Sequence, residues 1–299
     1  MPEEGIPYLP KKDLLTFEEI IRLATLMARM GISKIRITGG EPFVRTDLMH
    51  FLRELVAVPE VKEVHITTNG VLTAPFVPEL KSLGIASVNL SLDSLDPKRF
   101  RAITRRNEIA NVLATLDSLL DHRIPVKVNA VVMAEKNLDD IIPLAELTRA
   151  HPISVRFIEE MPFNGSGTRP LIFWNHRDIL KHLQGQYPNL QKIADPSNAT
   201  ASHFKVPGYA GTLGIIAAYS RTFCGTCNRL RITAQGMLKT CLYDDGVLDI
   251  RALLRSSASD EALRAALMHA FRNRSASGFE AEQRRSEHPV HESMSTIGG

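Results

Sequence analysis

The chain has 299 residues, of which 44% are hydrophobic and 23% are charged, and its formal net charge is +3. These values are typical of a globular protein of one or two domains, and the small net charge disfavours a general nucleic-acid binder. No stretch approaches the roughly 20 apolar residues that cross a membrane, so the sequence predicts a cytoplasmic protein without a membrane anchor.

Between residues 34 and 161 two periodicities alternate. Helical spacing is found at residues 16–30, 46–57, 74–83, 107–122 and 137–150. Short β-branched runs lie between these stretches, in "SKIRITGG", "KEVHITTNG", "ASVNLSLD", "IPVKVNAVV" and "ISVRFIEEM". Strands that alternate with helices predict parallel βαβ units.

The expected strands are apolar on one side only. Alternate positions place one set of side chains on the apolar side: Ile35, Ile37, Val64, Ile66, Val88, Leu90, Leu92, Val126, Val128 and Val155. The other side carries polar residues: Arg36, Thr38, His65, Thr67, Asn89, Ser91, Asp93, Lys127, Asn129 and Arg156. A doubly wound sheet is apolar on both faces, and a closed eight-stranded barrel has an apolar interior. The pattern therefore predicts a partial (β/α), TIM-like barrel with a polar lumen.

After Met161 the βα pattern stops. "PFNGSGTRP" is typical of a linker, residues 174–183 are expected to be helical, and hairpin strands are expected within 203–219 and 228–240. Residues 248–274 are again expected to be helical, and the polar stretch from Ser275 is expected to be flexible. The predicted organisation is a barrel at 1–162, a second domain at 163–274 and a tail at 275–299.

All three cysteines lie in one short stretch, at Cys224, Cys227 and Cys241. Two interpretations remain open from the residues alone. A histidine such as His203 completes a Cys₃His zinc site, or three thiolates hold an iron–sulfur cluster with one open iron. Arg229 and Arg231 follow directly, and they either clamp a phosphate or carboxylate or belong to a solvated strand face.

Several other residues are candidates for binding. The glycines of "RITGGEP" (Arg36 to Pro42) allow close approach of a ligand, or simply form a tight turn. Lys127 faces the lumen, as an anion ligand or as a Schiff-base nucleophile, because buried lysines are rare unless paired. Thr67, Ser91 and Asp93 lie near the carboxyl ends of strands, where parallel barrels place their sites, although each is also a plausible turn or cap residue.

Taken in order, these motifs resemble one known family along the whole chain. "KIRITGGEP", "TTNG", "NLSLD", "VKVN", "RFIEEM", "FCGTCNRLRIT" and the terminal "IGG" are similar to the GTP 3′,8-cyclases of molybdenum cofactor biosynthesis, which are radical S-adenosylmethionine (SAM) enzymes. The resemblance implies a six-unit partial barrel with a C-terminal iron–sulfur domain. It also implies conversion of GTP to 3′,8-cyclo-7,8-dihydro-GTP, in a homodimer whose reductant is unknown.

The resemblance also implies roles for individual residues. Gly40, Ser91 and Met161 are expected to contact SAM, and GTP is expected to contact Arg36, Thr67, Lys127, Arg229, Leu230 and Arg231. Cys224, Cys227 and Cys241 are expected to hold a [4Fe–4S] cluster whose fourth iron takes the purine of GTP. Gly298 and Gly299 are expected to reach toward the active site.

The chain departs from the family pattern at its start. Family members begin with a strand and a CxxxCxxC loop that holds a second [4Fe–4S] cluster, the one that cleaves SAM, whereas this chain starts at "MPEEG" and has no cysteine before Cys224. The first barrel strand is expected to be missing as well. The chain as written is therefore expected not to generate the SAM-derived radical by itself. It is either a truncated form of the enzyme or a degenerate paralogue that keeps the GTP and second-cluster site.

Two alternatives to the cyclase follow from the same residues. One is a non-catalytic iron–sulfur or zinc module that binds nucleotide. The other is a Schiff-base lyase that uses Lys127, which leaves the three cysteines unexplained.

Overall fold

The structure is a computed structural model that describes residues 9–163, 174–285 and 292–297, and the chain divides into two compact units. The first unit combines residues 1–64, 162–169 and 228–299, and the second combines residues 65–161 and 170–227. Each unit takes segments from both sides of residue 162. This division into units differs from the domain limits of 1–162, 163–274 and 275–299 that the sequence predicts. Those domain limits remain a prediction.

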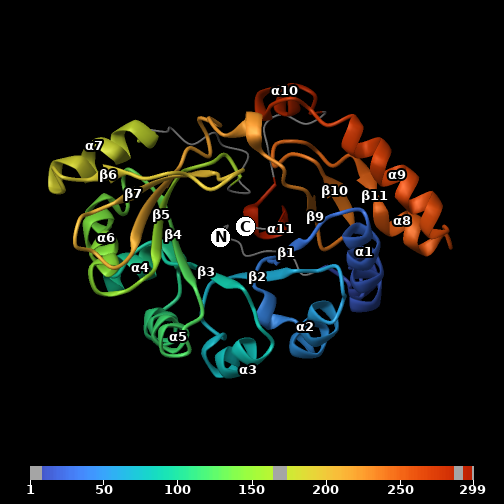
Figure 1. Ribbon diagram of the computed structural model, residues 1–299, viewed down its shortest axis with the longest axis horizontal. Coiled ribbons are helices and arrows are strands. Elements are labelled where there is room, and N and C mark those ends of the chain that lie inside the picture. The colour runs from blue at the N-terminus through green and yellow to red at the C-terminus, as the bar shows by residue number, and fades with distance from the viewer. Residues whose placement is uncertain (1–8, 164–173, 286–291, 298–299) are drawn as a thin grey trace. The chain divides into compact units, whose positions relative to one another are not determined.

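The second unit is built on a mixed sheet (Figure 1). Its strands follow one another in space as β2 (Glu63–Thr68), β3 (Ser87–Ser91), β4 (Val126–Val132), β5 (Ser154–Glu159), β8 (Thr212–Ile216), β7 (Ala201–Lys205) and β6 (Gln191–Lys192). The pairs from β2 through β8 are parallel, and β8–β7 and β7–β6 are antiparallel. The expected parallel βαβ units are confirmed, as is a hairpin within residues 203–219.

The helices of this unit cover one face of the parallel strands (Figure 1). They are η3 (Ala74–Phe76) with α3 (Val77–Ser82), α4 (Pro97–Thr104), α5 (Ile109–Asp121) and α6 (Ile141–Ala150), followed after β5 by α7 (His176–Gln186). Val128 and Val155 are fully buried, whereas their neighbours Lys127 and Arg156 are half-buried. The two-faced strands expected from the sequence are therefore present.

The first unit contains a smaller antiparallel sheet and a set of helices. The sheet has the order β11 (Leu248–Asp249), β10 (Met237–Lys239), β9 (Arg231–Ile232), and β9–β10 is the hairpin expected within 228–240. The remaining elements are η1 (Lys11–Asp13), α1 (Phe17–Arg29), β1 (Lys34–Ile37), η2 (Pro42–Val44), α2 (Leu48–Val56), α8 (Ile250–Arg255), α9 (Asp260–Arg272), α10 (Gly278–Gln283) and α11 (Met294–Ile297).

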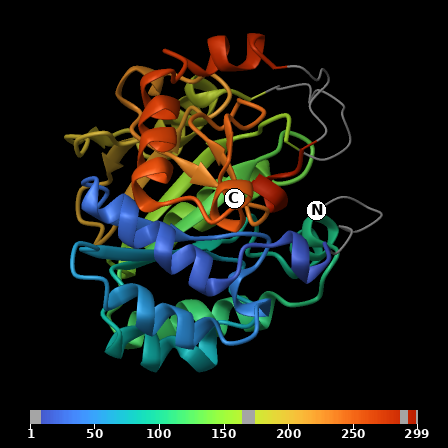
Figure 2. The same cartoon turned by 90° about the vertical axis from the view of Figure 1, so that its right-hand side faces the viewer.

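Helix α1 packs beside α9 (Figure 2, blue against orange). It begins with the expected capping box, in which the Thr16 hydroxyl accepts from the backbone of Glu19 and the Glu19 carboxylate accepts from the backbone of Thr16. One apolar cluster then joins α1 to α8, α9 and β10, and its members include Leu26, Leu238 and Leu267. An ion pair of 2.8 Å between Arg22 and Asp260 also joins α1 to α9.

Three segments differ from expectation. Helix α4 was not predicted, and residues 248–274 form a short strand and two helices because Ser259 caps a new helix by accepting from Ala262 N at 3.2 Å. The segment expected to be a flexible tail contains α10, in which Ala281 is buried. Residues 164–170 of the expected linker, and Gly298 and Gly299, lie outside the described residues. In the part of the chain that the structure describes, no helix is long and apolar enough to cross a membrane.

Candidate functional site

The polar face of the parallel strands brings three predicted residues together. Thr67 pairs with Asn89, and Asn89 pairs with Lys127, so these residues form one row across β2, β3 and β4. Ser91 pairs with Asn129 in the row beside it. Neighbouring strands lie about 4.8 Å apart, so the side chains of Thr67, Ser91 and Lys127 belong to one polar patch on this face.

This face contains buried polar atoms that lack a hydrogen-bond partner. The amide oxygens of Asn89 and Asn129 and the hydroxyl of Ser154 are buried, and none has a partner among the described residues. Buried polar groups are normally satisfied, and exceptions occur where a ligand or ordered water binds. The face is therefore suited to a polar molecule.

Arg156 is a further cation on this face that the expected ligand set omitted. It pairs with Asn129 on one side and with Gly214 of β8 on the other. A Cβ at Gly214 would lie 3.1 Å from Arg156 Cγ, so the glycine leaves room for the arginine stem. The strand alternation had already placed Arg156 on the polar side, and that was the signal available in the sequence.

Asp93 follows β3 and supports the face from its edge. Its Oδ1 accepts a hydrogen bond of 2.8 Å from Val131 N, and its carbonyl accepts one of 2.9 Å from the Asn137 side chain. Burial raises the pKa of Asp93 to about 6, although the bond from Val131 opposes the rise. Through these hydrogen bonds Asp93 links the end of β3 to β4 and to the loop that follows it.

Met161 follows β5 and is half-buried, and the carboxylate of Glu159 lies just before it. Glu159 is fully buried and accepts five hydrogen bonds. Its donors are the backbone and ring nitrogens of His176, the backbone of Tyr219, and the backbone and hydroxyl of Ser220. Burial alone would raise the pKa of Glu159, but these bonds outweigh it and lower the pKa.

In the first unit, Arg36 and Arg229 form a cationic pair. Arg36 lies in β1 and is exposed, yet the surrounding protein and the nearby positive charge of Arg229 lower its pKa. Two positive charges in one neighbourhood create a local potential that attracts anions. Arg231 lies in β9, whereas the side chain of Leu230 packs against the apolar cluster of this unit.

The "GGEP" turn after β1 combines a glycine conformation with a cap. Gly39 has a φ of 152°, which only glycine adopts readily, and Glu41 Oε1 accepts from Phe43 N at 3.1 Å. Gly40 is exposed beside it. The turn thus presents Gly40 at the carboxyl end of a strand.

The three cysteines are half-buried and none forms a disulfide. Cys224 opens a 3-10 turn, Cys224–Thr226, that brings Cys227 N to 3.2 Å from Cys224 O in the second unit. Cys241 lies in the first unit. Among the described residues no three His, Cys, Asp or Glu side chains form a group that could hold a metal ion. His203, the candidate zinc ligand, places its Nδ1 3.0 Å from Asp195 Oδ1.

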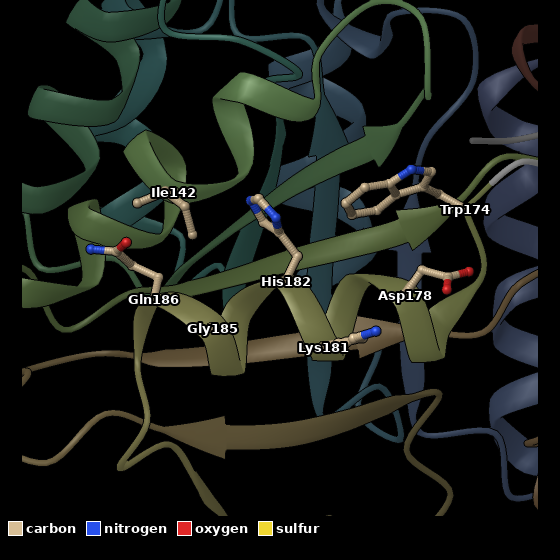
Figure 3. A pocket seen from close by; sticks show the side chains of 7 residues that line it. All are labelled: Ile142, Trp174, Asp178, Lys181, His182, Gly185 and Gln186. Atoms are coloured by element: carbon tan, nitrogen blue, oxygen red, sulfur yellow. The ribbon is translucent and has the colours of Figure 1, made fainter.

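One surface pocket, of about 530 Å³, lies away from these residues (Figure 3). It lies along α7 and is lined by Ile142, Trp174, Asp178, Lys181, His182, Gly185 and Gln186. The rings of Trp174 and His182 meet edge to face with centroids 5.4 Å apart. None of the residues predicted for the site lines this pocket.

Comparison with known proteins gives two family matches that together span most of the chain. Residues 3–148 match the radical SAM superfamily, and residues 153–279 match the family described as Molybdenum Cofactor Synthesis C. Streptococcus suis SuiB bound to S-adenosylmethionine is similar in structure, with a TM-score of 0.60 at 14% identity over 84% of this chain and 60% of that one. At that identity the likeness shows the fold alone, a TIM-like α/β fold of the radical SAM type.

Curated relatives agree with these matches. Molybdenum cofactor biosynthesis protein 1 of Bos taurus is 42% identical over 88% of this chain and 42% of its own length. The chain thus spans about half the length of the animal relatives that it matches. The GTP 3′,8-cyclase of Moorella thermoacetica is 40% identical over 89% of this chain and 82% of its own length. The chain therefore belongs to the radical SAM superfamily and, within it, to the molybdenum cofactor biosynthesis family that includes the GTP 3′,8-cyclases.

Proposed function

We propose that this chain is the GTP-binding part of a GTP 3′,8-cyclase, organised as a partial βα barrel followed by an iron–sulfur domain. The observation that carries the proposal is the row of Thr67, Asn89 and Lys127, with buried amide oxygens that lack a partner among the described residues. The name of the Moorella relative supplies the substrate.

The proposed ligands divide by chemistry. Lys127, Arg36, Arg229 and Arg231 hold the triphosphate, because fixed cations recognise phosphate through charge-assisted hydrogen bonds. Thr67 and the backbone at Leu230 position the nucleotide. Gly40, Ser91 and Met161 hold SAM, which supplies the radical chemistry of this superfamily when bound at its cluster.

We assign Cys224, Cys227 and Cys241 to a [4Fe–4S] cluster with one open iron. Two things support this assignment: all three thiols are half-buried and outside disulfides, and three thiolates leave one iron of such a cluster for an exogenous ligand. The purine of GTP is the proposed ligand. By family likeness we also propose a cytoplasmic homodimer.

Nucleotide affinity tests the GTP site. Lys127→Ala should weaken GTP binding about ten- to a hundred-fold, because a charge-assisted contact contributes about 1.5 to 3 kcal/mol. Anaerobic titration calorimetry with GTP measures this. Lys98→Ala is the matched control, since Lys98 is exposed on α4 and no predicted site residue lies on that helix. Equal GTP affinity in the two variants would refute the placement of GTP on the polar face.

Metal analysis of the anaerobically reconstituted chain separates the proposal from its main alternative. About four irons per chain, lost in Cys241→Ala, support the cluster. Bound zinc instead favours the non-catalytic nucleotide module, since three thiolates and a histidine are a common zinc set.

A further inference from the structure

A buried group of charges lies beside the loop that carries Cys241, in the first unit. Lys239, at the end of β10, keeps only 1% of its side chain exposed. Its Nζ lies 2.8 and 2.9 Å from the two carboxylate oxygens of Glu292. Buried lysines need such a partner. The partner here lies more than 50 residues further along the chain.

Arg285 completes the group. Its side chain is 2% exposed, and its guanidinium lies 2.8 Å from Asp245 Oδ1 and 3.1 Å from Glu292 Oε2. Among the residues that the structure describes, the two cations and two carboxylates of this group balance. Arg285 also donates to the carbonyls of Tyr243 and Asp244, at 3.4 and 3.2 Å, so it binds the backbone of the loop as well as its side chains.

The loop of residues 240–246, here called the Cys241 loop, is built around the Asp244 carboxylate. Oδ2 accepts from the backbone nitrogens of Thr240 and Cys241, each at 2.8 Å, and Oδ1 accepts from Gly246 N at 2.9 Å. Tyr243 N lies 3.5 Å from Cys241 Sγ. The position of the thiol thus follows from the position of the loop.

The C-terminal segment of residues 292–297 makes a second attachment, through its backbone, near the same loop. Met294 N donates to Phe163 O at 3.2 Å, and the Phe163 ring lies 5.1 Å from the Tyr243 ring. Ile297 is 2% exposed. The segment is therefore held by the charged contact of Glu292 and by a backbone hydrogen bond at Met294.

We propose that Lys239, Arg285 and Glu292 form a charge clamp that docks residues 292–297 on the Cys241 loop and thereby sets the position of the Cys241 thiol. Glu292 is a positioning residue, because it contacts both cations and lies on the docked segment. The clamp rests on the proposed function only in that Cys241 is taken as a cluster ligand.

The reactivity of the thiols tests the clamp on the whole chain, purified anaerobically before any metal is added. Alkylation by iodoacetamide is followed for each cysteine by mass spectrometry, and the rate at Cys241 is divided by the rate at Cys224. Glu292→Gln should raise this ratio about tenfold, because it leaves two buried cations with one carboxylate. Hydrogen exchange at residues 240–246 and 294–297 should accelerate together.

Two variants serve as controls. Glu261→Gln removes an exposed carboxylate on α9 and should leave the ratio unchanged, and Glu292→Asp keeps the charge and should stay near the wild-type ratio. If Glu292→Gln does not fold, the double variant Lys239→Met with Glu292→Met replaces it with the same expectation, since it leaves neither charge of that pair unpaired. An unchanged ratio, or equal acceleration at all three thiols, overturns the proposal.

The outcome is independent of the GTP and metal experiments. No nucleotide, SAM or iron is present during alkylation, so a chain that fails to bind GTP still reports on the clamp. Conversely, four bound irons with an unchanged thiol ratio would support the cluster and reject the clamp.

Discussion

At the scale of single residues, neighbouring carboxylates in this chain have opposite environments. Burial raises the pKa of Glu160, whereas five hydrogen bonds lower the pKa of Glu159 despite its burial. Asp93 resembles Glu160 in this respect. The number of donors that the backbone provides decides which form of a carboxyl the fold favours.

Asp93 should make stability depend on pH. Its pKa rises from an ordinary 3.8 to about 6 in the folded chain, so folding favours its protonated form. This contribution is complete below about pH 3.8 and is lost as the pH rises through 6, which costs up to about 3 kcal/mol of unfolding free energy at pH 7. Urea titrations from pH 4 to pH 7.5 should show this loss in the wild type and not in Asp93→Asn. Parallel curves for the two proteins would contradict the assignment.

Residue-level prediction from the sequence worked where alternation decides the environment. Thr67, Ser91 and Lys127 share a face because a strand reverses its side chains at every step. The charge clamp was not predictable, because Lys239 and Glu292 are joined by tertiary packing that no local period encodes. The role of the three cysteines as ligands of an iron–sulfur cluster also remains a prediction.

At the scale of elements, the helices that the sequence revealed are those with a broad apolar face. Helix α1 buries five residues and carries a capping box, and it was expected within one residue at each end. Helix α4 buries only Phe100, so its helical period is weak, although Asp96 caps it and Pro97 begins it. The prediction of one continuous helix at 248–274 was wrong, because Ser259 interrupts the apolar pattern and caps a separate helix.

Glu159 should hold three elements together. It joins the end of β5 to the first residue of α7 and to the turn that follows β8. Glu159→Gln places amide hydrogens against existing donors, so the unfolding free energy should fall by about 2 to 4 kcal/mol in urea denaturation at pH 7. Glu160→Gln is the matched control and should be tolerated, because burial already favours the neutral form there. Equal losses in the two variants would argue against this role.

At the scale of the whole molecule, the chain builds one unit from its two distant parts. Residues 17–29 and 260–272 form adjacent helices, and the middle of the chain forms the other unit. The sequence indicated βα units and a change of pattern after Met161. The sequence did not predict that α1 packs beside α9, because a local pattern does not indicate which distant apolar face a helix packs against.

A substitution in the shared core of the first unit should destabilise all the helices that pack in it. Leu267→Ala removes a fully buried side chain and should lower the unfolding free energy by about 2 to 5 kcal/mol. Hydrogen exchange should accelerate in α1 and in α9 together, and remain slow in β3, β4 and β5. Leu72→Ala, at a 43% exposed leucine, is the control that should change neither. Acceleration in α9 alone would contradict a shared core.

The joining of α1 to α9 also bears on how the polypeptide emerges from the ribosome. Roughly 240 residues separate the two helices, so at 5 to 20 residues per second the earlier one waits about 12 to 50 s for its partner. During that interval its apolar stripe, which includes Leu23, Leu26 and Met27, faces solvent on a nascent chain. Newly made molecules should therefore depend on chaperone binding until α9 has been synthesised.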